Sequence, residues 1–135
     1  MLELTLPLPV SANRYWRTWR GRMVVSAEAR AFKAAVALAA RQAGLGAPIE
    51  GPARVSLTLH PAAPADAAAR ARRLGPAWHL AVRSIDLDNA GKIALDSLQG
   101  VAFVNDRQVV DLHLQRGLPV AGGALVASIT AWTPT

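Results

Sequence analysis

Alternation of apolar and polar residues predicts four β-strands, because successive side chains of a strand point to opposite faces of a sheet. The segments with this pattern are residues 2–6, 54–60, 109–114 and 124–132. In the second segment, Val55, Leu57 and Leu59 share one face, which is typical of a strand that covers a core. Gly122 and Gly123 separate the last two segments and predict a turn between them.

A period of about 3.6 residues predicts two helices. Ser26 can cap the first helix, and Gly44 is a suitable end for it. The apolar stripe of this helix consists of Phe32, Val36, Ala39 and Ala43. Asp88 or Asn89 can cap the second helix, and Gly100 can end it. Its apolar stripe consists of Ala90, Ile93, Ala94 and Leu98.

The predicted order of elements is strand, helix, strand, helix, strand, strand. This order predicts an α/β (α+β) fold, in which two main helices pack on a mixed β-sheet of about four strands. The chain has 135 residues, and domains commonly contain about 100 to 150 residues. We therefore expect a single compact domain over residues 1–135.

Two further segments follow neither period. Residues 11–25, SANRYWRTWRGRMVV, interleave arginines with Tyr15 and two tryptophans, which predicts an exposed loop with a hairpin turn at Arg20 and Gly21. Residues 61–82 are rich in proline, alanine and arginine, and they predict an extended or flexible basic loop. A short helix over residues 65–73, opened by a proline, is the alternative for this second segment.

Charge narrows the choice of partner. The net charge is +6, and 13 of the 15 basic residues are arginine, whose planar side chain matches phosphate oxygens. An anionic polymer such as DNA is therefore a predicted partner. High-GC coding sequences also favour alanine and arginine, so composition alone leaves both explanations open.

Cysteine is absent, which excludes disulfides, thiolate zinc sites and a thiol nucleophile. No apolar run approaches the roughly 20 residues that cross a bilayer, and the first ten residues lack the basic segment of a secretion signal. We expect a soluble, cytoplasmic protein that is associated with the nucleoid through DNA binding.

The acidic residues are concentrated in one part of the chain, since five of the nine lie between residues 86 and 111. In an extended segment Asp86 and Asp88 would point to the same face, and a hard divalent cation such as Mg²⁺ would relieve their repulsion. Asp106, in a turn before a strand, could complete such a site from a second element. An ordinary turn aspartate is the alternative for Asp106.

Lys92 lies four residues after Asp88, one helical turn along the same face. A surface ion pair would also explain this spacing, and Asp96, four residues further on, offers Lys92 a second partner. Because Lys92 is one of only two lysines, a role in stabilising charge on a phosphate is also predicted. Asp111 belongs to the next strand and is expected to face solvent.

Three stretches together resemble the RusA family of Holliday junction endonucleases, and the resemblance covers nearly the whole chain. They are LPLPVSANRYWRTWRGRMVVSAEARAF, DLDNAGKIALDSL and NDRQVVD, which begin at Leu6, Asp86 and Asn105. The resemblance implies a homodimeric, Mg²⁺-dependent nuclease, with Mn²⁺ as a substitute metal. Such enzymes are typical of phage and prophage genomes, and they nick opposed strands of a four-way DNA junction.

The resemblance also implies roles for particular residues. Asp86, Asp88 and Asp106 correspond to metal-binding aspartates, and Lys92 corresponds to a lysine that is essential for cleavage. Asn89 and Asn105 are predicted to support these groups. From the arginine-rich segments, the predicted DNA-binding residues are Arg14, Tyr15, Trp16, Arg17, Arg20, Arg22, Arg72, Arg73 and Arg83.

The chain departs from the family pattern in two places. Residues 61–82 are longer than the usual connection, which leaves the preference for DNA shape open. Asn105 stands where an acid is common, which leaves metal affinity open. Two alternative functions remain at this stage: a catalytically silent DNA-binding module, and a metal nuclease that acts on other branched or flap DNA.

Overall fold

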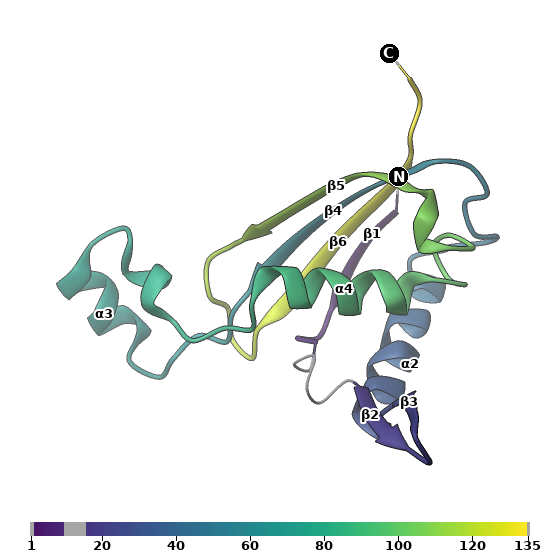
Figure 1. Ribbon diagram of the computed structural model, residues 1–135. Helices are drawn as coiled ribbons and strands as arrows, with labels where there is room; N and C mark the ends of the chain where they lie inside the picture. The colour runs from purple at the N-terminus through teal and green to yellow at the C-terminus, as the bar shows by residue number, and fades with distance from the viewer. Residues whose placement is uncertain (1, 10–15, 135) are drawn as a thin grey trace.

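The computed structural model describes residues 2–9 and 16–134 (Figure 1). A four-stranded sheet has the order β1-β6-β4-β5, in which β4 and β5 are parallel and the other neighbours are antiparallel. Its strands are β1 (Leu2–Leu6), β4 (Ala53–His60), β5 (Val109–Arg116) and β6 (Ala124–Ala131). The predicted mixed α/β fold with four strands in one compact domain is confirmed.

Two helices, α2 (Ala27–Gln42) and α4 (Leu87–Leu98), lie on one face of this sheet (Figure 1). Alternate strand residues meet them in one core, which includes Leu4, Leu57 and Leu125. Residues of the opposite sheet face are intermediate or exposed, as expected for a sheet that is covered by helices on one face only. The sheet therefore has one face packed against the two helices and one face that is open.

Helix α2 begins where the sequence predicts. The Ser26 hydroxyl accepts a hydrogen bond of 3.1 Å from the amide of Ala29, which satisfies one of the free N–H groups at the helix start. Its apolar stripe differs from the prediction, since Ala40 is buried whereas Ala39 is half-buried and Ala43 is exposed. The buried face is Ala29, Phe32, Val36 and Ala40. Ala43 lies beyond the last turn as the C-cap, so it cannot continue this face.

The predicted loop over residues 11–25 contains a β-hairpin in its described part, so the prediction of a loop is wrong there. Strands β2 (Trp16–Trp19) and β3 (Arg22–Val25) pair antiparallel, and the predicted turn at Arg20 and Gly21 is confirmed. Both turn residues have positive φ, 51° and 72°, as a two-residue hairpin turn of the favoured twist requires. Arg14 and Tyr15 lie outside the described residues.

Residues 61–82 are also more regular than a loop. They contain helix α3 (Ala67–Leu74) and a 3₁₀ helix, η1 (Trp78–Ala81). The alternative prediction of a short helix over residues 65–73 is confirmed, and the prediction of an extended or flexible loop is wrong. In the described ranges, no helix has the length and apolar character needed to cross a membrane.

Candidate metal and DNA-binding site

The start of α4 carries three of the predicted site residues. Asp86 is the N-cap of the helix, and Asp88 lies in the first turn, so the predictions of an Asp88 or Asn89 cap and of an extended Asp86–Asp88 segment are wrong. The carbonyl of Asp86 accepts the first helical hydrogen bond, 2.9 Å from the amide of Ala90. Both aspartates are exposed, at a helix end whose dipole favours negative charge.

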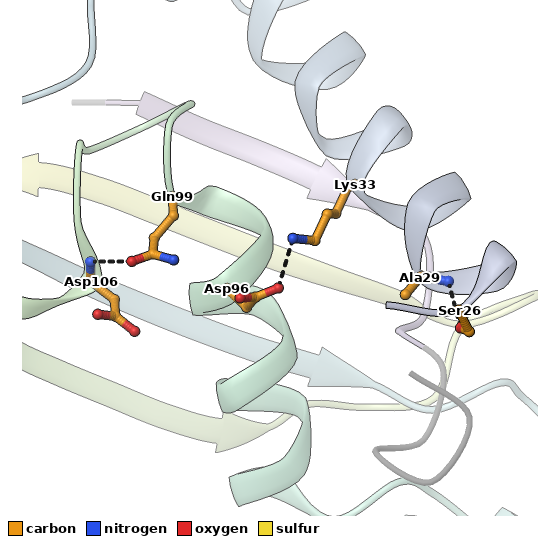
Figure 2. Close-up of polar contacts among 6 residues, drawn as sticks. All are labelled: Ser26, Ala29, Lys33, Asp96, Gln99 and Asp106. Atoms are coloured by element: carbon orange, nitrogen blue, oxygen red, sulfur yellow. Dashed lines mark hydrogen bonds and ion pairs between the residues drawn. The ribbon is translucent and has the colours of Figure 1, made fainter. Parts of the chain in front are cut away.

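Lys92 lies one turn after Asp88 on the exposed side of α4. The predicted pairing of Lys92 with Asp96 is wrong, because Asp96 forms its ion pair with Lys33 of α2, 2.9 Å from Nζ to Oδ2 (Figure 2). Among the described residues, Lys92 has no ion pair of its own. Its side chain is therefore exposed, one helical turn after Asp88.

Packing of the inner face of α4 determines which of its residues are exposed. Ala90, Ile93 and Ala94 are buried in the core, which turns Lys92 between them outward. Gly91 touches β5 so closely that a Cβ atom there would lie 3.1 Å from Cδ1 of Leu114. The first turns of α4 therefore sit over the end of β5.

Asp106 lies at the other end of the same helix. It begins a 3₁₀ turn, η2 (Asp106–Gln108), and its amide donates a hydrogen bond of 3.0 Å to Oε1 of Gln99, the C-cap residue of α4 (Figure 2). The 12 residues of α4 span about 18 Å, at about 1.5 Å each. Within one chain, Asp106 is therefore far from Asp86 and Asp88.

A metal ion bound by all three aspartates would need their oxygens within about 2 to 2.6 Å of it. In residues 2–9 and 16–134, no group of three or more His, Cys, Asp or Glu residues is placed to hold one ion. Asp86 and Asp88 by themselves fit a hard cation, since both are exposed carboxylates and neither has an ion pair within the described structure. One chain thus supplies two candidate ligands that are two residues apart, with the third candidate at the other end of α4.

Two glutamines that the sequence reasoning missed hold Asp106 in place. The side chain of Gln99 accepts a hydrogen bond from the amide of Asp106. The side chain of Gln108 accepts one from the amide of Asn105, which completes a capping box with the Asn105 side chain. The Gln108 amide also donates to the carbonyls of Ile49, at 2.7 Å, and Gly51, at 2.9 Å. The pair Asn105 and Gln108, three residues apart, is a recognisable capping signal.

The two predicted supporting asparagines have different positions. Asn105 accepts a hydrogen bond of 2.9 Å from the amide of Arg107 and so orders the turn that carries Asp106. Asn89 is half-buried inside the first turns of α4. Asp111 pairs with Arg54 on the open face of the sheet, with 2.8 Å between Nε and Oδ2.

The β2–β3 hairpin presents cations and large aromatic side chains together. Trp16 and Trp19 are 37% and 48% exposed, which is far from the burial of core residues. The guanidinium of Arg20 lies 4.4 Å from the centroid of a Trp19 ring, as in a cation–π contact. Arg22 is exposed on the same hairpin, and the side chain of Arg17 lies outside the described part.

Three other predicted DNA-binding arginines lie nearer to Asp86 in the chain. Arg72 and Arg73 are exposed in the last turn of α3, and Arg83 is exposed three residues before Asp86. The arginines thus fall into two groups, one on the hairpin and one on the connection that leads into α4.

Comparison with known proteins places this arrangement in a family. Residues 7–126 match the family described as endodeoxyribonuclease RusA. The chain is 35% identical to the crossover junction endodeoxyribonuclease RusA of Escherichia coli K12 over 129 residues, which are 95% of this chain and 92% of that protein. Over the same shares it is 34% identical to the protein of that name from Shigella sonnei and 33% identical to that of Enterobacteria phage 82. The match covers the hairpin, both ends of α4 and the turn with Asp106, and the chain belongs to the RusA endodeoxyribonuclease family.

Proposed function

We propose that this protein is a divalent-metal-dependent endonuclease that resolves four-way DNA junctions by paired nicks, acting as a homodimer in the cytoplasm at the nucleoid. Its relatives are named for crossover junctions, which supports the substrate class. The observation that carries the proposal is the exposed group Asp86, Asp88 and Lys92 on one end of α4, in a chain with a net charge of +6.

Asp86 and Asp88 would hold the metal, with Mg²⁺ the expected ion and Mn²⁺ a substitute. A metal ion at these carboxylates would polarise a scissile phosphate and lower the pKa of bound water. Lys92, a compact and exposed cation one turn away, is placed to stabilise negative charge that develops on the phosphate oxygens. The carboxylates would thus bind the metal, and the lysine would stabilise negative charge on the phosphate.

A homodimer would bring together the site residues that α4 holds apart within one chain. Strand β5 is an edge strand, with unpaired backbone groups and with Val110 and Leu112 exposed by 55% and 42%. Two copies related by a two-fold axis would pair such edges in opposite directions. Because Asp106 precedes β5 and α4 begins over the end of β5, this pairing would bring Asp106 of one copy towards Asp86 of the other.

A two-fold dimer also suits the substrate. A four-way junction has approximate two-fold symmetry, so two identical sites would face two equivalent strands. The exposed tryptophans of the hairpin could stack on bases at the crossover, and Arg20, Arg22 and Arg83 could neutralise phosphates. Binding should therefore weaken steeply as salt increases.

Subunit mixing tests the proposal directly. Asp86→Asn and Asp106→Asn should each bind a synthetic junction but leave it uncut in Mg²⁺. In a mixed dimer of the two variants, one site would keep both a native Asp86 and the Asp106 of the other copy, while the second site would lose both. We expect mixing to restore nicking of a single strand, measured on a junction with each strand labelled in turn.

Controls separate the parts of this proposal. Wild type with Mg²⁺ should nick two opposed strands of the junction and leave a matched linear duplex intact, and chelator should abolish both nicks. A mixed dimer as inactive as its parents would place Asp106 in its own chain's site or outside the chemistry. Equal cutting of flaps, duplex and junctions by wild type would contradict selectivity for four-way junctions.

A further inference from the structure

Residues 61–82 form an arm that the compact fold does not explain. We call this segment, with α3 and η1, the α3–η1 arm; it projects from one end of the sheet, away from α2 and the hairpin (Figure 1). Helix α3 has no buried residue, whereas α2 buries four. Leu74 and Leu80 are 51% and 62% exposed on this arm. Ordering these residues costs conformational entropy that burial within this chain does not offset.

Both ends of the arm are nevertheless fixed to the body. At the outgoing end, the amide of Ala63 donates to the carbonyl of Val120 at 2.8 Å, and the amide of Val120 donates to Pro61 at 2.9 Å. At the returning end, the Arg116 guanidinium donates to the carbonyl of Val82 at 2.9 Å, and the Val82 side chain is buried. Between its two buried ends, the arm is thus exposed or half-buried, and it is attached to the body at two points.

The returning end leads directly into the candidate site. Val82 is four residues before Asp86, and four extended residues span at most about 14 Å. Arg116, which holds Val82, is the last residue of β5. The arm is therefore joined to the first carboxylate by a short connection that starts at an anchored residue.

The arm carries three arginines and one acid, so its charge is net positive. Asp66, the acid in this segment, binds Arg70 with 2.9 Å between Oδ1 and Nε. The hydrogen bond from Arg70 lowers the pKa of Asp66, so this carboxyl stays ionised and is committed to that arginine. Arg72 and Arg73 are exposed and form no ion pair within residues 2–9 and 16–134. Two adjacent cations therefore remain at the outer part of the arm.

We infer that the α3–η1 arm holds the phosphate backbone of one duplex arm of the junction through Arg72 and Arg73, and so fixes which phosphate reaches Asp86. This inference rests on the proposed function for its substrate. The occupant is identified by charge complementarity, because exposed arginines that form no ion pair in the described residues match a phosphate backbone. A second copy of this basic chain would meet the same face with like charge.

Salt-dependent binding tests the first half of the inference. Arg72→Ala combined with Arg73→Ala should lower the slope of log affinity against log salt by about 1 per arginine, measured by fluorescence anisotropy on a four-way junction in chelator. A loss of two phosphate contacts means that the ratio of the variant's Kd to the wild-type Kd shrinks about 12-fold from 50 to 200 mM salt. Arg41→Ala, an exposed arginine at the end of α2, should leave the slope unchanged.

Each result of the binding test is informative. An unchanged slope in the arm variant, beside junction cutting by wild type, would overturn the arm's role and leave the proposed function standing. A reduced slope in the arm variant, together with a wild type that cuts no junction, would support duplex holding while contradicting the proposed function. A fall in dimer mass in the arm variant, seen by sedimentation with an unchanged slope, would assign the arm to a protein contact instead.

The position of the nick tests the second half. Arg116→Ala releases Val82 but keeps both arm cations, so the salt slope should stay while nicks spread to neighbouring phosphates on sequencing gels. Gln115→Ala is the matched control, since Gln115 bonds Thr58 on the other face of the sheet at 3.0 Å and should give the wild-type nick position. A single wild-type nick position in folded Arg116→Ala would overturn the positioning role.

Discussion

The chain has two lysines, and their side chains have different surroundings. Lys33 joins α2 to α4 through Asp96, whereas Lys92 faces solvent one turn after Asp88. Spacing alone could not separate these roles, because Lys92 has an acid four residues away on each side. The partner of Asp96 comes from a distant part of the chain, so only the packing of two helices decides it.

Lys92→Met should reduce the single-turnover rate of junction cleavage about 10²- to 10³-fold, the usual loss when one group that stabilises transition-state charge is removed. The junction Kd, measured in chelator, should change little, since a single phosphate contact contributes a small part of the total.

Lys33→Met is the matched control for this substitution. It should leave the cleavage rate within about twofold and lower the free energy of unfolding by less than about 1 kcal/mol, because the ion pair is partly exposed. If both variants lost cleavage equally, the assignment of Lys92 to stabilising transition-state charge would be wrong.

At the scale of elements, the ends of α4 determine what the site contains. The first turns carry Asp86 and Asp88, and the C-cap residue Gln99 holds the amide of Asp106. Gln108 fixes the same turn to the segment before β4 through two backbone carbonyls. Removing this glutamine would leave the amide of Asn105 and the carbonyl of Ile49, both part-buried, without this partner.

Gln108→Ala should lower the free energy of unfolding by about 2 kcal/mol, since each hydrogen bond contributes about 0.5 to 1.5 kcal/mol. Urea unfolding gives this value, and cleavage should also fall, because Asp106 loses the turn that orients it. Gln115→Ala removes one exposed hydrogen bond and should cost less than about 1 kcal/mol. Equal stability of the two variants would contradict the role assigned to Gln108.

Sequence pattern was sufficient for the regular elements that contribute to the core. The strands and α2 follow clear periods because one face of each is buried, as with Leu57 and Phe32. The hairpin and α3 were not predicted in the same way, since they bury little and so carry no apolar period. Their structure depends on turn geometry at Arg20 and on anchoring at Val82.

At the scale of the whole molecule, the sheet has an open edge at β5. Leu112→Lys would place a charge on that edge, and we expect the protein to sediment as a monomer and to lose junction cleavage. The monomer should stay folded, because Leu112 is already 42% exposed.

Leu38→Lys is the matched control, since Leu38 is 47% exposed on α2 and lies away from β5. It should leave both dimer mass and cleavage unchanged. A Leu112→Lys protein that remains dimeric would exclude pairing through the β5 edge.

The candidate site was only partly accessible to sequence reasoning. The motifs that carry Asp86, Asp88 and Lys92 are local, so their proximity follows from chain spacing. Asp106 is near the same residues in sequence, yet the intervening helix carries it to the opposite end. A motif cannot reveal such a separation, nor whether a second copy closes it.

Strand β1 is an edge strand whose neighbour in the sheet is β6, and β6 lies near the other end of the described chain. During synthesis on a ribosome, Leu4 and Leu6 must therefore wait for their pairing partner on the order of ten seconds, at about 5 to 20 residues per second. Until then the backbone N–H and C=O groups of β1 lack the strand that pairs with them. Strand β1 can join the sheet only after β6 has been synthesised, so the nascent chain is most exposed to aggregation and chaperones just before β6 emerges.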